Sequence, residues 1–154
     1  MKPNELLRHL RKLLALNENG MAEILTLGQW DADSEAVKHW LKQENEAGYQ
    51  PCPERVPAHF LEGLIISRRG QKEGAPTPAP EQPLSNNQVL KKLRIAFELQ
   101  GEDMHNLFAE GGQTLTKQAL DALFRTPEHR NYQACSDQSL RRFLQALTER
   151  FRPH

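Results

Sequence analysis

The sequence predicts an all-α protein made of two similar four-helix units that are joined by a proline-rich linker. Apolar residues recur at spacings of three and four along most of the chain, which is the pattern of one helix face. The segment Met21–Leu41 returns as Met104–Phe124 at a constant offset of 83 residues. Between the two copies, residues 71–84 contain four prolines and no apolar face, so an extended linker is expected there.

The duplication covers nearly the whole chain outside the linker. Residues 4–69 align with residues 87–152 without a gap, and about fifteen of roughly sixty-six columns are identical. A solenoid needs at least three repeats, so two copies indicate a duplicated structural unit instead. We therefore assign residues 1–70 to a first helical unit, 71–84 to the linker and 85–154 to a second helical unit.

The charge balance and the lengths of the apolar runs argue against several classes of protein. Twenty Lys and Arg residues balance twenty Asp and Glu residues, so no global charge attracts the chain to nucleic acid or to an anionic membrane. No apolar run is as long as a transmembrane helix, and charges interrupt the N-terminal stretch MKPNELLRHLRKLL where a signal peptide would be apolar. We expect a cytoplasmic protein with reduced cysteines and no membrane partner.

The first helix of each unit carries a leucine-rich face. Asn4 is a suitable N-cap after Pro3, and Ser85 with the two following asparagines can serve the second unit in the same way. The basic residues on the outer sides of these helices are interpreted as solvated surface: Arg8, Arg11, Lys12, Lys91, Lys92 and Arg94. Arg11 and Arg94 share one column, which a structural role, such as capping helix carbonyls or pairing with a carboxylate, would explain equally well.

The second and third helices form the outline of a helix-turn-helix in each unit. The second helix presents Met21, Ile24 and Leu25, and Gly28 is expected to be a left-handed C-terminal cap. Asp33 and Thr116 share the next capping column, and both residue types are good N-caps for the third helix.

The fourth helix follows a polar loop. Gly48 and Asn131 share a loop column and tolerate positive φ. Ser136 is suited to cap the fourth helix of the second unit. In the first unit Pro57 lacks a backbone donor, so that helix is expected to begin late or with an irregular turn.

Several motifs recur in both units: N-x-x-L-x-x-L-R, then M-x-x-(I/L)-(L/F)-x-x-G, Y-Q-x-C and F-L-x-x-L. As a set they resemble the bacterial YehS-like family, a family of unknown function whose domain occurs in tandem. The resemblance covers nearly the whole chain except the linker. It implies a tandem arrangement but supplies no catalytic residue, substrate or cofactor.

A second resemblance is to repressor-type helix-turn-helix domains, in which the third helix enters the major groove of DNA. A helix that reads a groove needs exposed donors and cations near phosphates and base edges. The first unit instead offers Asp31, Asp33 and Glu35, which would repel phosphates. The second unit offers a better set, and we predict nucleic-acid contacts at Thr114, Thr116, Lys117, Gln118 and Arg125.

Catalytic chemistry finds little support in the sequence. The six histidines never share a column between the units, and no phosphate loop or metalloprotease motif is present. Cys52 and Cys135 share a column just before the fourth helix and are interpreted as small buried residues, with a pair of reactive thiols or a small-ligand pocket as the alternative. We expect no enzyme activity, catalytic residue, cofactor or metal.

Two functions remain in competition. The leading hypothesis is a non-catalytic binding protein whose partner is DNA, bound through the second unit. The competing hypothesis is a protein-interaction adaptor that uses an apolar groove between the units, marked by Trp30, Ile65 or Ile66. The sequence leaves the oligomeric state, the identity of the partner and the role of the Tyr-Gln-x-Cys motif open.

Overall fold

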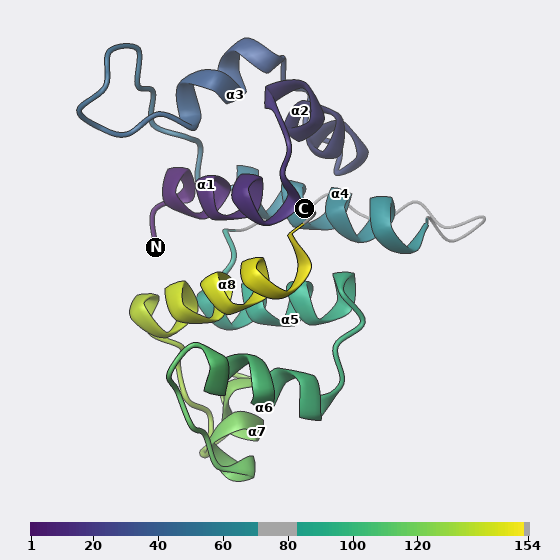
Figure 1. The fold of residues 1–154 in the computed structure, drawn as a ribbon, viewed down its shortest axis with the longest axis vertical. Coiled ribbons are helices and arrows are strands. Elements are labelled where there is room, and N and C mark those ends of the chain that lie inside the picture. The colour runs from purple at the N-terminus through teal and green to yellow at the C-terminus, as the bar shows by residue number, and fades with distance from the viewer. Residues whose placement is uncertain (71–82, 153–154) are drawn as a thin grey trace.

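The computed structural model describes residues 1–70 and 83–152, and these residues form eight α-helices and no strand. Most of the predicted linker, residues 71–82, lies outside the described residues. Each unit contributes four helices (Figure 1), so the predicted fold class is confirmed. The helices are α1 Pro3–Leu14, α2 Glu18–Leu27, α3 Ser34–Trp40, α4 Val56–Arg69, α5 Asn86–Ala96, α6 Gly101–Glu110, α7 Lys117–Leu123 and α8 Asp137–Phe151.

The two units pack through their first and last helices. Helix α1 packs on α8, and the equivalent helices α5 and α4 pack on each other. Exchanging the units exchanges these two contacts, so the arrangement is a pseudo-two-fold dimer within one chain. As Figure 1 shows, α3 and α7 consequently lie at opposite ends of the molecule.

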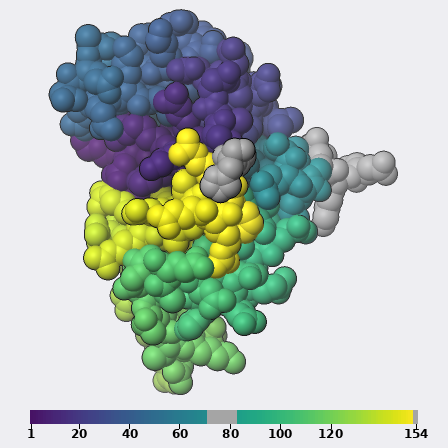
Figure 2. Space-filling view, viewed as in Figure 1, coloured from purple at the N-terminus to yellow at the C-terminus, as the bar shows by residue number. Residues whose placement is uncertain are grey.

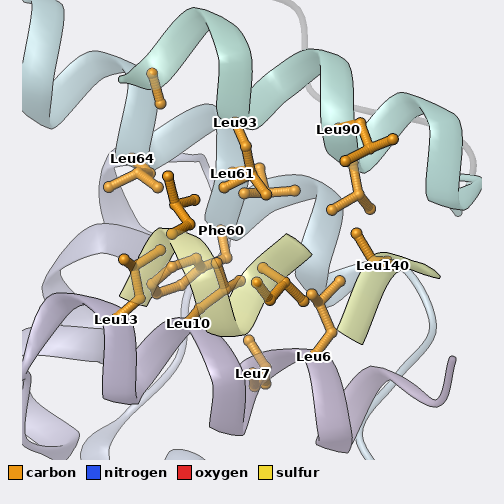
Figure 3. Packing of buried hydrophobic residues seen from close by; sticks show 14 of the residues in the cluster. Leu6, Leu7, Leu10, Leu13, Phe60, Leu61, Leu64, Leu90, Leu93 and Leu140 are labelled. Carbon is orange, nitrogen blue, oxygen red and sulfur yellow. The ribbon is translucent and has the colours of Figure 1, made fainter. Parts of the chain in front are cut away.

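The helices at this junction enclose a single core. Their leucine faces meet around Phe60 (Figure 3), and the fully buried side chains of both units belong to one continuous cluster. Burial of apolar surface on this scale is the main source of stability for such a domain. The expected groove between the units is therefore filled along these four helices. Trp30, Ile65 and Ile66 are half-buried, and the first two pack against the core.

Gly28 has a different role from the one predicted. Its φ is −84°, and the left-handed residue is the next one, Gln29, with a φ of 68°. A Cβ atom on Gly28 would lie 1.8 Å from the carbonyl oxygen of His59, and one on Gly63 would lie 1.9 Å from that of Ile24. Glycine is thus required here because the backbones of α2 and α4 approach each other closely.

The capping predictions were mostly correct. Asp33, Thr116 and Ser136 each accept a hydrogen bond from a backbone N–H in the first turn of their helix. Ser85 does the same for α5. Because Pro57 occupies the second position of α4, that helix begins at residue 56, after a turn over residues 54–55, as expected.

Asn4, in contrast, is not the cap of α1, because the helix already begins at Pro3. Its buried side chain donates to the carbonyl oxygens of Trp40 and Gln50, at 3.0 and 2.9 Å, and accepts from the N–H of Cys52 at 3.0 Å. In the loop column that tolerates positive φ, Gly48 adopts a φ of 88°, whereas Asn131 is not among the residues with positive φ.

The second unit repeats this arrangement at Asn87. Its side chain donates to the carbonyls of Leu123 and Gln133 and accepts from the N–H of Cys135. Each asparagine therefore ties the end of the third helix to the loop that carries the Tyr-Gln-x-Cys motif. We call these two arrangements the Asn4 clamp and the Asn87 clamp.

Arg11 and Arg94, which share a column, form the same hydrogen bond in both units. Each donates from Nε to a backbone carbonyl five residues later, that of Leu16 at 3.3 Å and that of Leu99 at 3.2 Å. These bonds support the left-handed turn that ends the first helix of each unit. Arg11 and Arg94 thus have a shared structural role, but their acceptors lie just beyond the helix rather than within it.

Candidate nucleic-acid interface

Helix α7 is anchored on the second unit by two buried leucines and by hydrogen bonds at its start. Leu120 and Leu123 are buried, and Thr116 closes the first turn by accepting from the N–H of Ala119 at 3.0 Å. The preceding turn is fixed by Gln113, whose side chain donates to the carbonyl of Ser139 at the start of α8 at 3.1 Å. Gly112 supplies the positive φ of 84° that the turn needs. One side of the helix is therefore packed on the unit, and the side chains on its outer face are exposed.

All five predicted contact residues are exposed, but they form two groups. One group comprises Thr114, Thr116, Lys117 and Gln118, in the turn before α7 and in its first turn. Arg125 follows the other end of the helix, roughly 12 Å from Lys117 along the axis at 1.5 Å per residue. Thr116 Oγ1 already accepts one hydrogen bond as the helix cap, so its O–H and one remaining lone pair are available for another partner.

Arg125 lines a surface cavity of about 310 Å³ that sequence reasoning did not find. The cavity lies between the N-terminal part of α5 and the segment after α7, and we call it the α5–α7 cavity. Its polar lining includes Ser85, Gln88, Lys91, Arg125, Thr126 and Tyr132. Among the described residues, neither Lys91 nor Arg125 has an ion pair or a side-chain hydrogen bond. The cavity thus combines two unpaired cations with neutral donors, a combination suited to an anion.

At the same place in the first unit, the equivalent cations each form a hydrogen bond within their own unit. Arg8, in the column of Lys91, donates to the carbonyl of Lys42 at 3.1 Å. Lys42, in the column of Arg125, donates to the carbonyl of Ala47 at 2.7 Å. A neighbouring ion pair joins Lys2 to Glu44. The first unit therefore uses its cations at this position to hold its own loop.

The two units also differ at the start of the third helix. Asp31, Asp33 and Glu35 are exposed on the first unit, and Asp33 additionally caps α3. The corresponding columns in the second unit hold Thr114, Thr116 and Gln118. The acidic and the neutral ends lie far apart in Figure 1, because α3 and α7 occupy opposite ends of the molecule.

Lys91 and Tyr132 were missed as members of the site because each has an ordinary explanation in the sequence. Lys91 lies in a basic helix face, and Tyr132 belongs to the repeated Tyr-Gln-x-Cys motif. In the aligned columns Glu5 and Glu44 of the first unit are replaced by Gln88 and Pro127 in the second. Those carboxylates pair with Arg141 and Lys2, whereas Arg8 and Lys42 bond to backbone carbonyls, so the aligned columns alone contain no signal for the cavity.

The repeated cysteines are buried, as predicted. Cys52 and Cys135 are each 6% exposed, and both are free thiols. Burial raises the pKa of the Cys52 thiol to about 12, and burial is also the largest cause of the raised pKa of Cys135. Reactive cysteines show the opposite shift, because the thiolate is the nucleophile.

His59 is buried, forms a hydrogen bond of 2.8 Å with the carbonyl of Gly28, and packs edge-on against Trp30. In the described part of the chain, no three His, Cys, Asp or Glu side chains gather in a possible metal site. Within the same ranges no helix is both long and apolar enough to cross a membrane.

Comparison with known proteins gives a family without an assigned activity. The family model described as "Protein of unknown function (DUF1456)" matches twice, over residues 3–70 and 86–152. The chain is similar to a protein described as "Uncharacterized protein YehS" from Escherichia coli (strain K12), with 42% identity over 150 residues. That alignment covers 97% of this chain and 96% of the relative. No solved structure matches the chain.

The two matched segments correspond to the two helical units, and the relative spans almost the whole chain including both of them. The resemblance inferred from the repeated motifs is thereby confirmed. The chain belongs to the DUF1456 family, whose domain it carries in two packed copies.

Proposed function

We propose that the protein is a non-catalytic binding protein that binds DNA through its second unit. The proposed surface consists of the first turn of α7 with the preceding turn, together with the α5–α7 cavity. A chain with this function would work in the cytoplasm, where its sequence predicts that it resides. Since the balanced net charge provides no global attraction, binding would depend on this local surface.

The observation that carries the proposal is the asymmetry between equivalent positions. The cations Arg8 and Lys42 are bonded to carbonyls of their own unit, whereas Lys91 and Arg125 have no such partner in the described structure. Unpaired cations beside exposed amide and hydroxyl groups are the usual means of contacting phosphates. The acidic α3 end of the first unit would be repelled by the same ligand.

The proposal assigns different tasks to the two groups of residues. Lys117, Lys91 and Arg125 would contact phosphates and so contribute to affinity on any sequence. Thr114 and Gln118 carry neutral donors and acceptors, which can approach base edges. A surface of three cations predicts weak, strongly salt-dependent binding, in which each phosphate contact adds about 0.9 to the salt slope.

Fluorescence anisotropy with a labelled duplex tests the proposal on the full chain. Binding is expected at low salt and should weaken by roughly tenfold, or about 1.4 kcal/mol, in Lys117→Glu and in Arg125→Glu. Lys38→Glu is the control, because Lys38 is exposed on α3 at the other end of the molecule. Absence of binding by the wild type at low salt, or equal loss in the control, would refute the proposal.

The adaptor hypothesis stays a prediction. Its markers Trp30, Ile65 and Ile66 are half-buried, and the helices between which its groove was expected pack against each other. A pull-down from native cells, with and without DNase, compares the two hypotheses directly. Partners that remain after DNase favour the adaptor, and partners that disappear favour the DNA-binding protein.

A further inference from the structure

A second basic cleft lies where the two units meet, away from α7. It has a volume of about 600 Å³ and is lined mainly by the end of α1 and the turn after it. One lining residue, Arg152, comes from the second unit. In Figure 2 the yellow C-terminal end of the described chain lies against the purple surface of the first unit. We call this site the junction cleft.

Four cations line the junction cleft, and no carboxylate side chain of residues 1–70 or 83–152 does. They are Arg8, Arg11, Lys12 and Arg152. Its apolar lining consists of Ala15, Leu16 and Leu41. The cleft is therefore a strongly positive concavity with an apolar part, and its volume falls in the range of small-molecule sites.

Two of the cations are fixed in place. Arg8 donates from Nη1 to the carbonyl of Lys42 at 3.1 Å, and Arg11 donates from Nε to the carbonyl of Leu16 at 3.3 Å. Each guanidinium has five N–H donors, so most of its donors remain available. Lys12 and Arg152 are exposed, and no side-chain partner for either is found within the described residues.

The pseudo-two-fold symmetry relates the junction cleft to an equivalent position that involves the second unit, so the two positions can be compared residue by residue. There Arg69, in the column of Arg152, donates to the carbonyl of Ile95 at 3.2 Å and pairs with Glu98 at 3.7 Å. The guanidinium of Arg94 lies 5.1 Å from the ring centre of Phe124. The arginines of that copy are thus engaged by partners within the chain, and we call it the closed copy and the junction cleft the open copy.

Three substitutions distinguish the open copy from the closed one. Lys12 replaces Ile95, Ala15 replaces Glu98, and Leu41 replaces Phe124. The first adds a positive charge, the second removes a negative charge, and the third exchanges a ring for a smaller side chain. All three changes favour an anion from solution over a partner within the chain.

We propose that the junction cleft binds a small molecule that carries a pyrophosphate group, such as a nucleoside diphosphate or triphosphate. Four cations complement a pyrophosphate group, which carries several adjacent negative charges, better than they complement a ligand with a single carboxylate. Guanidinium groups also bind phosphate oxygens well. The apolar lining would contact the organic part of the ligand. The site is independent of the proposed DNA surface, since none of its residues lies on α7 or lines the α5–α7 cavity.

Isothermal titration calorimetry of the full chain at low ionic strength tests this inference with inorganic pyrophosphate, ATP and adenosine. Pyrophosphate and ATP are expected to bind at one site per chain, more weakly as salt is added, and ATP more tightly than pyrophosphate. Adenosine alone should show no binding. Failure of both phosphate compounds to bind, or equal binding of ATP and adenosine, would overturn the proposal.

Two variants transfer residues of the closed copy into the open one. Ala15→Glu places a carboxylate beside Arg152, and the backbone already accepts glutamate there, because Ala15 and Glu98 have φ values of 52° and 54°. Lys12→Ile removes one cation. Each variant should weaken pyrophosphate binding by at least about tenfold, an ordinary effect for a charged hydrogen-bond partner.

The control variants separate this site from the rest of the surface. Arg69→Gln alters the closed copy, and Lys117→Glu alters the proposed DNA surface, so both should bind pyrophosphate like the wild type. Circular dichroism of Ala15→Glu and Lys12→Ile checks that the helices remain. Unchanged binding in these two variants, or loss in a folded control variant, would place the ligand elsewhere and overturn the assignment.

Discussion

Glu5 of the first unit and Arg141 of the second form an ion pair with two hydrogen bonds. Arg141 donates from Nε to Oε2 of Glu5 at 2.6 Å and from Nη2 to Oε1 at 3.0 Å. The pair connects α1 to α8 across the junction of the units. A second ion pair across the junction joins Lys92 of α5 to Glu62 of α4.

These ion pairs depend on the two units being different. In the aligned columns Arg141 corresponds to Ala58, so a first unit packed on a copy of itself would leave Glu5 without its cation. Glu62 corresponds to Gln145, so Lys92 would lose its carboxylate if two second units packed together. Unpaired charges of this kind disfavour the wrong partner. The sequence divergence therefore specifies packing within the chain.

The Glu5–Arg141 pair predicts a pH dependence of stability. The hydrogen bond from Arg141 is the largest cause that lowers the pKa of Glu5 below its ordinary value of 4.5. A lowered pKa in the folded state means that the stabilisation is present above about pH 4.5 and is lost as pH falls through the folded pKa. Thermal unfolding of wild type and Glu5→Gln should differ most at neutral pH and converge in acid.

Asp137 contributes a pH dependence of its own to the stability of both proteins. The pKa of its carboxyl is also lowered, first by a hydrogen bond from Asn86 and then by the N-terminal amino group. Both proteins keep this group, so only the difference between them reports on Glu5. A difference in melting temperature that stays constant from pH 7 to pH 3 would contradict the assigned role of the pair.

The close approach of α2 and α4 predicts a severe effect of a small substitution. Gly63→Ala would place its methyl carbon 1.9 Å from the carbonyl oxygen of Ile24, a backbone atom that cannot move alone. We expect a loss of about 2–4 kcal/mol in the free energy of unfolding, which spans the upper part of the usual range for overpacking and extends beyond it. Denaturant titration followed by circular dichroism measures it.

Gly101→Ala is the matched control for that substitution. Gly101 lies in the first turn of α6, its φ is not positive, and nothing lies within 4 Å of an added Cβ. Alanine should therefore leave stability unchanged or raise it by about 0.4–1 kcal/mol, through the unfolded chain. Equal effects of the two substitutions would show that the contact between α2 and α4 is looser than the structure indicates.

The sequence was sufficient for features that are set by local patterns. Helix faces follow from spacing, and the caps Asp33, Thr116 and Ser136 act on backbone groups three residues away. Pro57 delays α4 through its own missing donor. Each of these effects operates within one turn of the chain, so neighbouring residues contain the necessary information.

Features that depend on distant partners were not predictable in the same way. Asn4 suits an N-cap by its chemistry, but its actual acceptors lie 36 and 46 residues away. Gly28 suits a left-handed cap, but the constraint comes from the backbone of His59 on another helix. The cavities around Arg125 and Arg152 likewise arise from helices that meet only in the folded chain.

The Asn4 clamp predicts a large stability effect from a polar deletion. Asn4→Ala would leave two carbonyls and the N–H of Cys52 without their partner, and the side chain is buried. Each unsatisfied buried group costs about 1–3 kcal/mol, although water can reach some of them, so we expect a total of roughly 2–5 kcal/mol. Chemical denaturation monitored by circular dichroism is the measurement.

An exposed asparagine provides the control for this prediction. Asn45 lies on the surface and forms no side-chain bond within the described chain, so Asn45→Ala should change stability by less than about 0.5 kcal/mol. Asn87→Ala should resemble Asn4→Ala, because the two clamps are equivalent. If Asn4→Ala were as mild as Asn45→Ala, the clamp would not stabilise the unit.

The buried thiols predict slow labelling that the clamps control. Cys52 and Cys135 are each 6% exposed and burial raises the pKa of both, so an aromatic disulfide reagent should react with the native chain far more slowly than with the denatured chain. Asn87→Ala removes the acceptor of the Cys135 N–H and should accelerate labelling of Cys135 while Cys52 stays slow. Mass spectrometry of the two peptides separates the sites. Labelling of native Cys52 at the rate of a free thiol would contradict the structure and support the thiol alternative.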